Sequence, residues 1–103
     1  MAKSLTWKQQ VQLVAPINKR VKASLTEGLR AGGIEARIGL ESVPGTKLWR
    51  VKVISPKFAK LRPSERQDLV WRILSDSLTR EEQFQISMVL TLTPAEESGT
   101  WDD

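Results

Sequence analysis

The sequence contains no cysteine, no histidine and no tyrosine among its 103 residues. Without cysteine the chain has no disulfide, no thiolate metal site and no cysteine nucleophile, and a reducing, cytoplasmic location suits it. Without histidine it lacks the commonest metal ligand and the side chain best suited to acid–base catalysis near neutral pH. These absences predict a protein with no catalytic residues, no metal site, no cofactor and no enzymatic activity.

Long apolar stretches are missing as well. No run approaches the roughly 20 residues that a membrane-spanning helix needs. The N-terminus has a lysine but no continuous apolar segment behind it, so it does not have the pattern of a secretory signal. A chain of 103 residues is typical of one domain. We therefore expect a small single domain without a membrane partner.

Charge is plentiful but unevenly distributed, and the net value is +4. Residues 1–66 carry fourteen of the 16 Lys and Arg and four of the 12 Asp and Glu, which gives +10. Residues 67–103 carry the other two basic and eight acidic residues, which gives −6. The basic part favours an anionic partner for one end of the molecule. A well-solvated surface with an acidic tail is an equally good interpretation.

Two segments have the apolar spacing of an amphipathic helix. After Pro16, apolar residues recur every four positions and predict a helix over residues 16–31. Ser64 and Gln67 are spaced as a capping box, which predicts the start of a second helix over residues 64–78. Both helices should bury a single stripe.

Three other segments alternate apolar and polar residues, as half-buried strands do. We expect strands over residues 34–42, 47–55 and 84–93. A Pro-Gly turn joins the first two, so they should pair antiparallel. The last two are joined through a helix, so they should be parallel neighbours.

The order helix, strand, strand, helix, strand predicts an α+β fold. It is a two-layer α/β sandwich in which both helices cover one face of a three-stranded mixed sheet. Val89 and Thr91 should lie on the opposite, open face. The residues expected in the core are Leu25, Ile38, Trp49, Val51, Val53, Leu69, Ile73, Ile86, Met88 and Leu90. We assign residues 1–15 to a leader segment, 16–94 to the domain and 95–103 to a flexible acidic tail.

Two stretches carry a family resemblance. The segment "VKVISPKFAKLRPSERQDLVWRILSDSL", with Ile54, Ser55 and Phe58 as its V-S-x-x-F motif, resembles the BolA family. The segment "SMVLTLTPAE" resembles the closing strand and T-x-T-P-E ending of that family. Together the resemblance covers roughly residues 17–97 and implies a BolA-like fold similar to type II KH domains. It also implies a monothiol glutaredoxin as partner.

The chain lacks the histidines that this resemblance would bring. Family members have an Arg-His-Arg group on the second helix, and its histidine is implicated in iron–sulfur ligation with the glutaredoxin. The corresponding residues are Arg66, Gln67 and Asp68. The histidine that usually opens the last strand corresponds to Gln85 or its neighbour. Because an amide is a poor ligand for iron compared with imidazole, we expect no ligation of the cluster by this chain.

A basic loop is the main candidate site in the sequence. It leads into the N-terminus of the second helix, where cationic side chains and backbone N–H groups together suit phosphate. BolA-like proteins are also thought to bind DNA through this region. The nucleic-acid-binding residues we predict are Lys57, Lys60, Arg62 and Arg66, with Arg50 and Lys52 nearby.

The sequence thus leaves two hypotheses for a non-enzymatic binding module. The leading one is binding of DNA or RNA, or a regulatory role, through the basic loop and helix N-terminus. The alternative is a BolA-like protein-interaction adaptor that has lost iron–sulfur ligation. A basic loop that is merely solvated and binds nothing is also compatible with the same residues.

Overall fold

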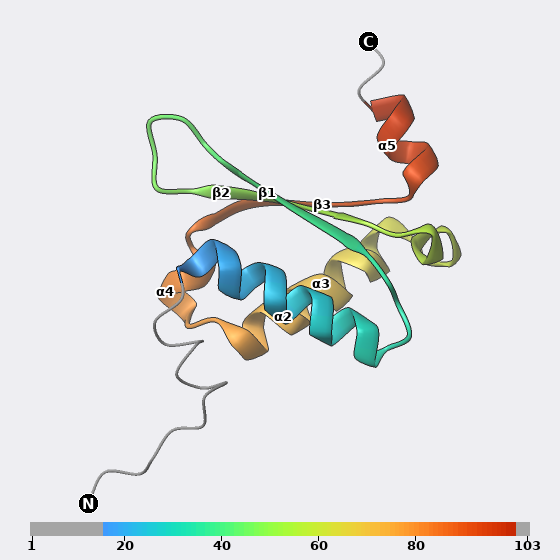
Figure 1. Cartoon of the computed structure of the whole chain (residues 1–103), viewed down its shortest axis with the longest axis horizontal. Helices are drawn as coiled ribbons and strands as arrows, with labels where there is room; N and C mark the ends of the chain where they lie inside the picture. Colours follow the sequence, from blue (N-terminus) through green and yellow to red (C-terminus); the bar gives the residue numbers. More distant parts are fainter. Residues whose placement is uncertain (1–15, 101–103) are drawn as a thin grey trace, which may run out of the picture.

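The computed structural model describes residues 16–100, so the leader assigned to residues 1–15 and the last three residues lie outside the described part. The elements are α2 (Ile17–Ala31), β1 (Arg37–Ser42), β2 (Trp49–Ile54), η1 (Pro56–Lys60), α3 (Pro63–Ser77), α4 (Arg80–Gln83), β3 (Ile86–Leu92) and α5 (Pro94–Thr100). Figure 1 shows α2 and α3 side by side beneath the sheet, while α5 lies beyond its other side. The predicted α+β sandwich is confirmed.

The sheet has the predicted topology. It contains three strands in the order β1-β2-β3. Strands β1 and β2 pair antiparallel, and β2 and β3 pair parallel through the α3 crossover. Every helix within residues 16–100 is too short or too polar to cross a membrane.

The core lies between the two helices and the covered face of the sheet. It contains Val21, Leu25, Leu29, Val51, Val53, Phe58, Val70, Leu74, Leu78, Ile86 and Val89, all buried. Half-buried residues pack around it, and they include the predicted core residues Ile38, Trp49, Leu69 and Ile73. The α2 stripe is as the spacing predicted, since its members lie on one face of a helix.

The side-chain alternation predicted for β3 is wrong beyond Ile86. The pairing register shifts by one residue, because Trp49 lies opposite Ile86 whereas Arg50 lies opposite Met88. A bulge of one residue moves every later side chain to the other face of the sheet. Val89 is therefore buried on the covered face, and Met88 is 47% exposed on the open one.

The same shift corrects two further positions. Thr91 is buried on the covered face instead of the open one. Leu90 lies opposite Lys52 on the open face, where it is half-buried. Alternation alone favoured the more apolar set for the core, and a bulge leaves no mark in that pattern.

Helix α2 packs closely against α3 at a glycine. A methyl group placed on Gly28 would lie 2.7 Å from Cγ2 of Ile73, nearer than real side chains approach. Only glycine allows the two helices this separation. Gly28 therefore serves the contact between the two helices.

Two predictions, one about the start of α3 and one about the C-terminal segment, need correction. Helix α3 begins at Pro63 with Arg62 as its N-cap residue, and the Arg62 N–H donates to Glu65 Oε1 at 2.9 Å. The predicted capping box of Ser64 and Gln67 is not formed. Residues 94–100 form helix α5 and make ion pairs, where the sequence predicted a flexible tail.

Candidate functional site

The basic loop is built around a buried serine and a buried phenylalanine. Ser55 is fully buried, and its Oγ donates to the carbonyl oxygen of Glu35 at 2.8 Å. The same oxygen accepts from the N–H of Lys57 at 3.2 Å and caps η1. Phe58, inside η1, is also fully buried in the core. The motif that carries the family resemblance thus fixes the loop to the domain.

Three of the predicted phosphate-binding residues lie exposed on this loop. Lys57 and Lys60 belong to η1, and both are exposed. Arg62 follows at the start of α3, where 80% of its side chain is exposed and its Nε lies 3.4 Å from Glu65 Oε1. The backbone N–H of Arg62 lowers the pKa of Glu65, and the guanidinium adds to this effect. These three cations form one short basic stretch.

Arg66 is different, because its side chain is only 6% exposed. Its Nε donates to the carbonyl oxygens of Phe58 at 2.9 Å and Leu61 at 3.0 Å. Its Nη1 donates to the carbonyl oxygen of Thr91 at 3.3 Å and to Glu96 Oε1 at 2.7 Å. The buried guanidinium thus joins η1, β3 and α5.

Gln67, at the position where the resemblance implies a histidine, also bonds to β3. Its Nε2 donates to the carbonyl oxygen of Val89 at 2.7 Å. The side chain is half-buried, and the bond ties the first turns of α3 to the strand. An amide that is committed to a backbone carbonyl is a poor candidate for a metal ligand.

These two bonds occupy the outer edge of β3. The carbonyl of Leu92 accepts from the Ser55 N–H on the β2 side. Successive carbonyls along a strand point to opposite sides, so those of Thr91 and Val89 point to the outer edge. Arg66 and Gln67 donate to these same carbonyls. Side chains of α3 therefore close this edge of the sheet.

The remaining two predicted residues lie on the open face of β2, away from the loop. Arg50 donates to Glu41 Oε1 across the hairpin at 2.9 Å. Lys52 Nζ lies 3.5 Å from Glu97 Oε2, and the other oxygen of that carboxylate accepts from Arg37 at 2.8 Å. The six predicted residues therefore do not form one patch.

Helix α5 carries Glu96, which pairs with Arg66, and Glu97, which pairs with Lys52. Thr93 caps the helix, since its Oγ1 accepts from the Glu96 N–H at 3.1 Å and its own N–H donates to Glu96 Oε1 at 2.8 Å. The Thr93 N–H and the Arg66 guanidinium lower the pKa of Glu96. The segment Thr93-Pro94-Ala95-Glu96 is a capping box, and this spacing is the sequence feature that could have predicted α5.

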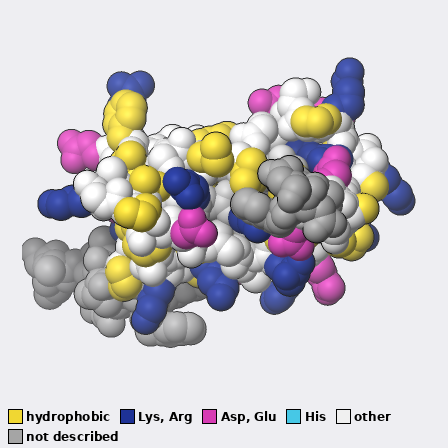
Figure 2. Space-filling model, turned by 90° about the horizontal axis from the view of Figure 1, so that it is seen from above, with side chains coloured by type: hydrophobic (Ala, Val, Ile, Leu, Met, Phe, Trp, Pro, Cys, Tyr) yellow, Lys and Arg dark blue, Asp and Glu magenta, His cyan; other side chains and the backbone are white. Residues whose placement is uncertain are grey.

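The open face also carries apolar side chains. Met88 lies opposite Arg50, Leu90 opposite Lys52 and Leu92 opposite Ile54 on this face. Figure 2, which looks onto this side, shows hydrophobic side chains interspersed with basic and acidic ones. Phe84, the C-cap residue of α4 two residues before β3, is 75% exposed. Apolar residues of this size in contact with solvent are typical of a surface that binds a partner.

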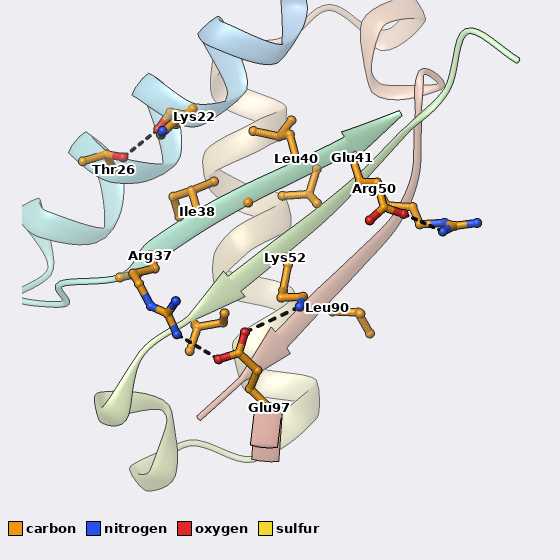
Figure 3. Close-up of a pocket in the computed structure, with 14 residues that line it drawn as sticks. Lys22, Thr26, Arg37, Ile38, Leu40, Glu41, Arg50, Lys52, Leu90 and Glu97 are labelled. Atoms are coloured by element: carbon orange, nitrogen blue, oxygen red, sulfur yellow. Dashed lines mark hydrogen bonds and ion pairs between the residues drawn. The ribbon is translucent and has the colours of Figure 1, made fainter. Parts of the chain in front are cut away.

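A groove runs along β1, the strand at the other edge of the sheet. It has a volume of about 600 Å³ and is lined by Lys22 and Thr26 of α2, residues 37–41 of β1, and Lys52. Figure 3 shows Ile38 and Leu40 on the side of β1 that faces α2, with Lys22 and Thr26 across from them. The sequence analysis did not identify this groove, because it depends on how α2 lies against the edge strand.

Helix α2, the far wall of the groove, is held at its first turns by an ion pair. Arg20 donates through both terminal nitrogens to the carboxylate of Glu82 on α4. This bond, together with the N–H of Thr79, lowers the pKa of Glu82 to about 2. The side chain of Glu82 also completes a capping box with Thr79.

The described residues contain no set of side chains suited to ligate a metal ion or an iron–sulfur cluster. No group of three or more Asp and Glu side chains gathers between residues 16 and 100, and the sequence has no histidine or cysteine to add. The acidic residues of the open face are paired with Arg50, Arg37 and Lys52. Iron–sulfur chemistry, which prefers thiolate and imidazole, does not fit these donors.

Comparison with known proteins identifies the fold. No protein-family model matches the sequence, and no curated protein matches it. Among solved structures, BolA1 from Arabidopsis thaliana is similar with a TM-score of 0.55 at 18% identity, over 81% of this chain and 98% of that one. BolA1 from Mus musculus has a TM-score of 0.49 at 25% identity, over 97% of this chain and 77% of that one.

The match to the plant protein shows that the chain has a BolA-like fold. This agrees with the resemblance that the V-S-x-x-F motif carries in the sequence. The observed order of elements and the mixed sheet support the same conclusion.

Proposed function

We propose that this protein is a small protein-interaction adaptor without enzymatic activity and without a role as an iron–sulfur ligand. The observation that carries the proposal is the open face of the sheet, where the β3 bulge exposes Met88 beside Arg50. Methionine adapts its shape to different partners, and arginine is enriched at protein interfaces. A cytoplasmic location belongs to this proposal, since a chain without cysteine needs no oxidising compartment.

The BolA-like fold supports a partner protein as the target of this surface. The family resemblance implies a monothiol glutaredoxin, and we propose this class of partner. The bond between Gln67 and Val89 supports binding without ligation, because the amide at the expected ligand position is already used. The adaptor would then contact the glutaredoxin and leave its cluster unchanged.

Calorimetric titration with a cluster-free monothiol glutaredoxin tests the proposal. We expect binding to the native chain and a loss of roughly tenfold or more with Met88→Glu, because a charge would be buried in the contact. Ala23→Glu is the matched control, since Ala23 is exposed on α2 at the opposite side of the sheet. Equal binding by the native chain and Met88→Glu, or no binding by either, would contradict the proposal.

The cluster-bound glutaredoxin provides a second test. Its absorption and circular-dichroism spectra should stay unchanged when this chain is added, because the chain supplies no imidazole or thiolate. New spectral bands that depend on the chain would show that it does provide a ligand.

A second candidate function is binding of DNA or RNA at the basic stretch of Lys57, Lys60 and Arg62. It is supported by the exposure of all three residues beside the N-terminus of the 15-residue helix α3. We omit Arg66, which is buried, and Arg50 and Lys52, which are paired on another face. Three cations are fewer than the sequence predicted, so the binding would be weaker.

The salt dependence of binding tests this second function. Three phosphate contacts predict a slope of logarithmic affinity against logarithmic salt of roughly −2 to −3. Substituting Lys60 and Arg62 with alanine should remove roughly two contacts from that slope. Anisotropy titrations with single- and double-stranded oligonucleotides measure it. If no binding is seen at low salt, the nucleic-acid function is excluded.

A further inference from the structure

The two outer strands of the sheet differ in how their edges are covered. Within residues 16–100, no strand pairs with the outer edge of β1. Its pairing with β2 is regular over residues 37–42, and the strand contains no proline. At β3, in contrast, side chains of α3 bond to the outward carbonyls. An edge strand that is regular and uncovered offers its backbone groups to another strand.

The groove along β1 suits an added strand. Ile38 and Leu40 are half-buried and lie on the side facing α2, so they can contact apolar side chains of an incoming segment. On the other side of β1, Gly39 leaves room, because a methyl group there would meet only Cβ of Lys52 at 3.9 Å. A strand that pairs with β1 would place alternate side chains in these two positions.

The charged residues beside the groove indicate which charge the incoming segment should carry. Lys19 and Lys22 lie on α2 beside Ile38 and Leu40. Both lysines are exposed, and neither forms an ion pair with a described side chain. The carboxylates nearest in the groove, those of Glu41 and Glu97, are paired with arginine and lysine. The unneutralised charge of this wall is therefore positive.

We propose that the outer edge of β1 binds an extended acidic segment of a partner protein, which adds to the sheet as a fourth strand. Backbone hydrogen bonds to residues 37–42 provide the attachment. On the face of the segment that points toward α2, apolar side chains contact Ile38 and Leu40, and carboxylates on the same face reach Lys19 and Lys22. This mode of recognition draws affinity from the backbone and specificity from alternate side chains.

A second copy of this chain fits the edge less well than an acidic segment. Pairing two β1 edges would place the α2 helices of both copies along the same side of the joined sheet. Lys19 and Lys22 of one copy would then approach those of the other, and like charges repel. A nucleic-acid backbone would satisfy the lysines but has no N–H and C=O groups spaced to pair with a strand.

The inference rests on the proposed adaptor function in one respect, because it too takes a protein as the partner. Its surface reaches Lys52 and Leu90 of the open face but does not include Met88. A chain that binds glutaredoxin through Met88 but binds no acidic segment would refute this inference alone. The opposite result would refute only the glutaredoxin proposal.

The probe is a labelled peptide of about eight residues in which valine and glutamate alternate along the one face that points toward α2, with threonine at the positions between. Fluorescence anisotropy should show that it binds the full chain, while the same peptide with lysine for glutamate should not. Two further versions carry N-methyl groups on alternate amides, one version for each edge of the peptide. Because only one edge can face β1, one version should bind at least roughly tenfold more weakly and the other should bind normally.

Substitutions in the chain test the charge. Lys19→Glu with Lys22→Glu should weaken binding of the acidic peptide by roughly tenfold or more. Lys47→Glu with Arg72→Glu changes the net charge equally at two exposed positions outside the groove and should leave binding within about threefold. Circular dichroism confirms that both variants fold.

Three results would overturn the inference. The first is equal binding of the two N-methylated peptides. The second is equal weakening by the two double substitutions. The third is a dimer of the chain alone whose β1 amides are protected from hydrogen exchange, since the edge would then be occupied by a second copy.

Discussion

Strands β3 and β1 are the two edge strands of the sheet, and they differ in the contacts that neighbouring side chains make with their outer edges. Along β3, Arg66 and Gln67 donate to the outward carbonyls, and Glu96 of α5 secures the Arg66 guanidinium. Along β1, a groove lies beside the strand and α2, and no described strand pairs with the outer edge there.

The difference teaches where function can lie. Arg66 and Gln67 occupy the positions that sequence reasoning associated with phosphate and with the missing metal ligand. Both are used to close the β3 edge, so they are not available to a ligand. The open face and the β1 edge keep polar and apolar groups in contact with solvent, and we assign partner binding to them.

Removing Arg66 should have the largest effect on this comparison. Arg66→Ala removes the side-chain donor from the carbonyls of Leu61 and Thr91, and it removes the ion-pair partner of Glu96. We expect the free energy of unfolding to fall by about 2–4 kcal/mol, measured by urea denaturation. Arg62→Ala, at an exposed position of the same helix, should cost less than about 1 kcal/mol. Equal losses would mean that the β3 edge does not depend on Arg66.

The packing of α2, the wall beside the open edge, can be tested at its glycine. Gly28→Ala should lower the free energy of unfolding by about 1–3 kcal/mol, because the new methyl group collides with Ile73. Gly39→Ala is the comparison on β1, and it should change stability by no more than about 0.5 kcal/mol. A stabilised Gly28→Ala variant would show that the helices can separate at little cost.

Gln67→Ala tests the same β3 edge and should lower stability less than Arg66→Ala does. The carbonyl of Val89 loses its side-chain donor, so we expect a loss of about 1 kcal/mol in the free energy of unfolding. Hydrogen exchange in β3 should become faster near Val89. The control is Asp68→Ala at the neighbouring exposed position, and a loss as large as that of Gln67→Ala would contradict a specific role for the amide bond.

Acid should weaken the attachment of α2 to α4, because it protonates Glu82 and so breaks the ion pair with Arg20. The pKa of Glu82 is lowered from 4.5 to about 2 in the folded protein, so the stabilisation it provides is complete above about pH 4.5. It is lost as the pH falls from there toward 2. Glu82→Gln should therefore cost about 1 kcal/mol near neutral pH and reduce the acid-induced loss of stability in this window. An unchanged acid profile would contradict the assigned pKa.

The sequence predicted much of the fold, because most elements have regular apolar spacing. The stripe of α2 and the alternation of β2 are examples, and the crossover between β2 and β3 followed from chain order. The orientation of β3 was missed because a bulge of one residue depends on how Ser87 fits beside Trp49. The Ser87 Oγ donates to the Trp49 carbonyl oxygen at 3.1 Å, a contact between distant residues.

The candidate site was predicted less well, for a related physical reason. Lys60 and Arg66 look equivalent in the sequence, because both are cations in one basic stretch. Only the folded chain shows that Arg66 turns toward backbone carbonyls while Lys60 remains exposed. Burial of a long cationic side chain depends on acceptors from several elements, and local spacing does not reveal them.

Amide chemical shifts recorded during titration with a cluster-free monothiol glutaredoxin test the central claim most directly. The claim is that the closed β3 edge is structural and that the partner binds the open face. We predict the largest shifts at Arg50, Met88 and Leu90, and small shifts at Gln67 and its neighbours on α3. Shifts concentrated around Gln67, with the open face unaffected, would contradict the account.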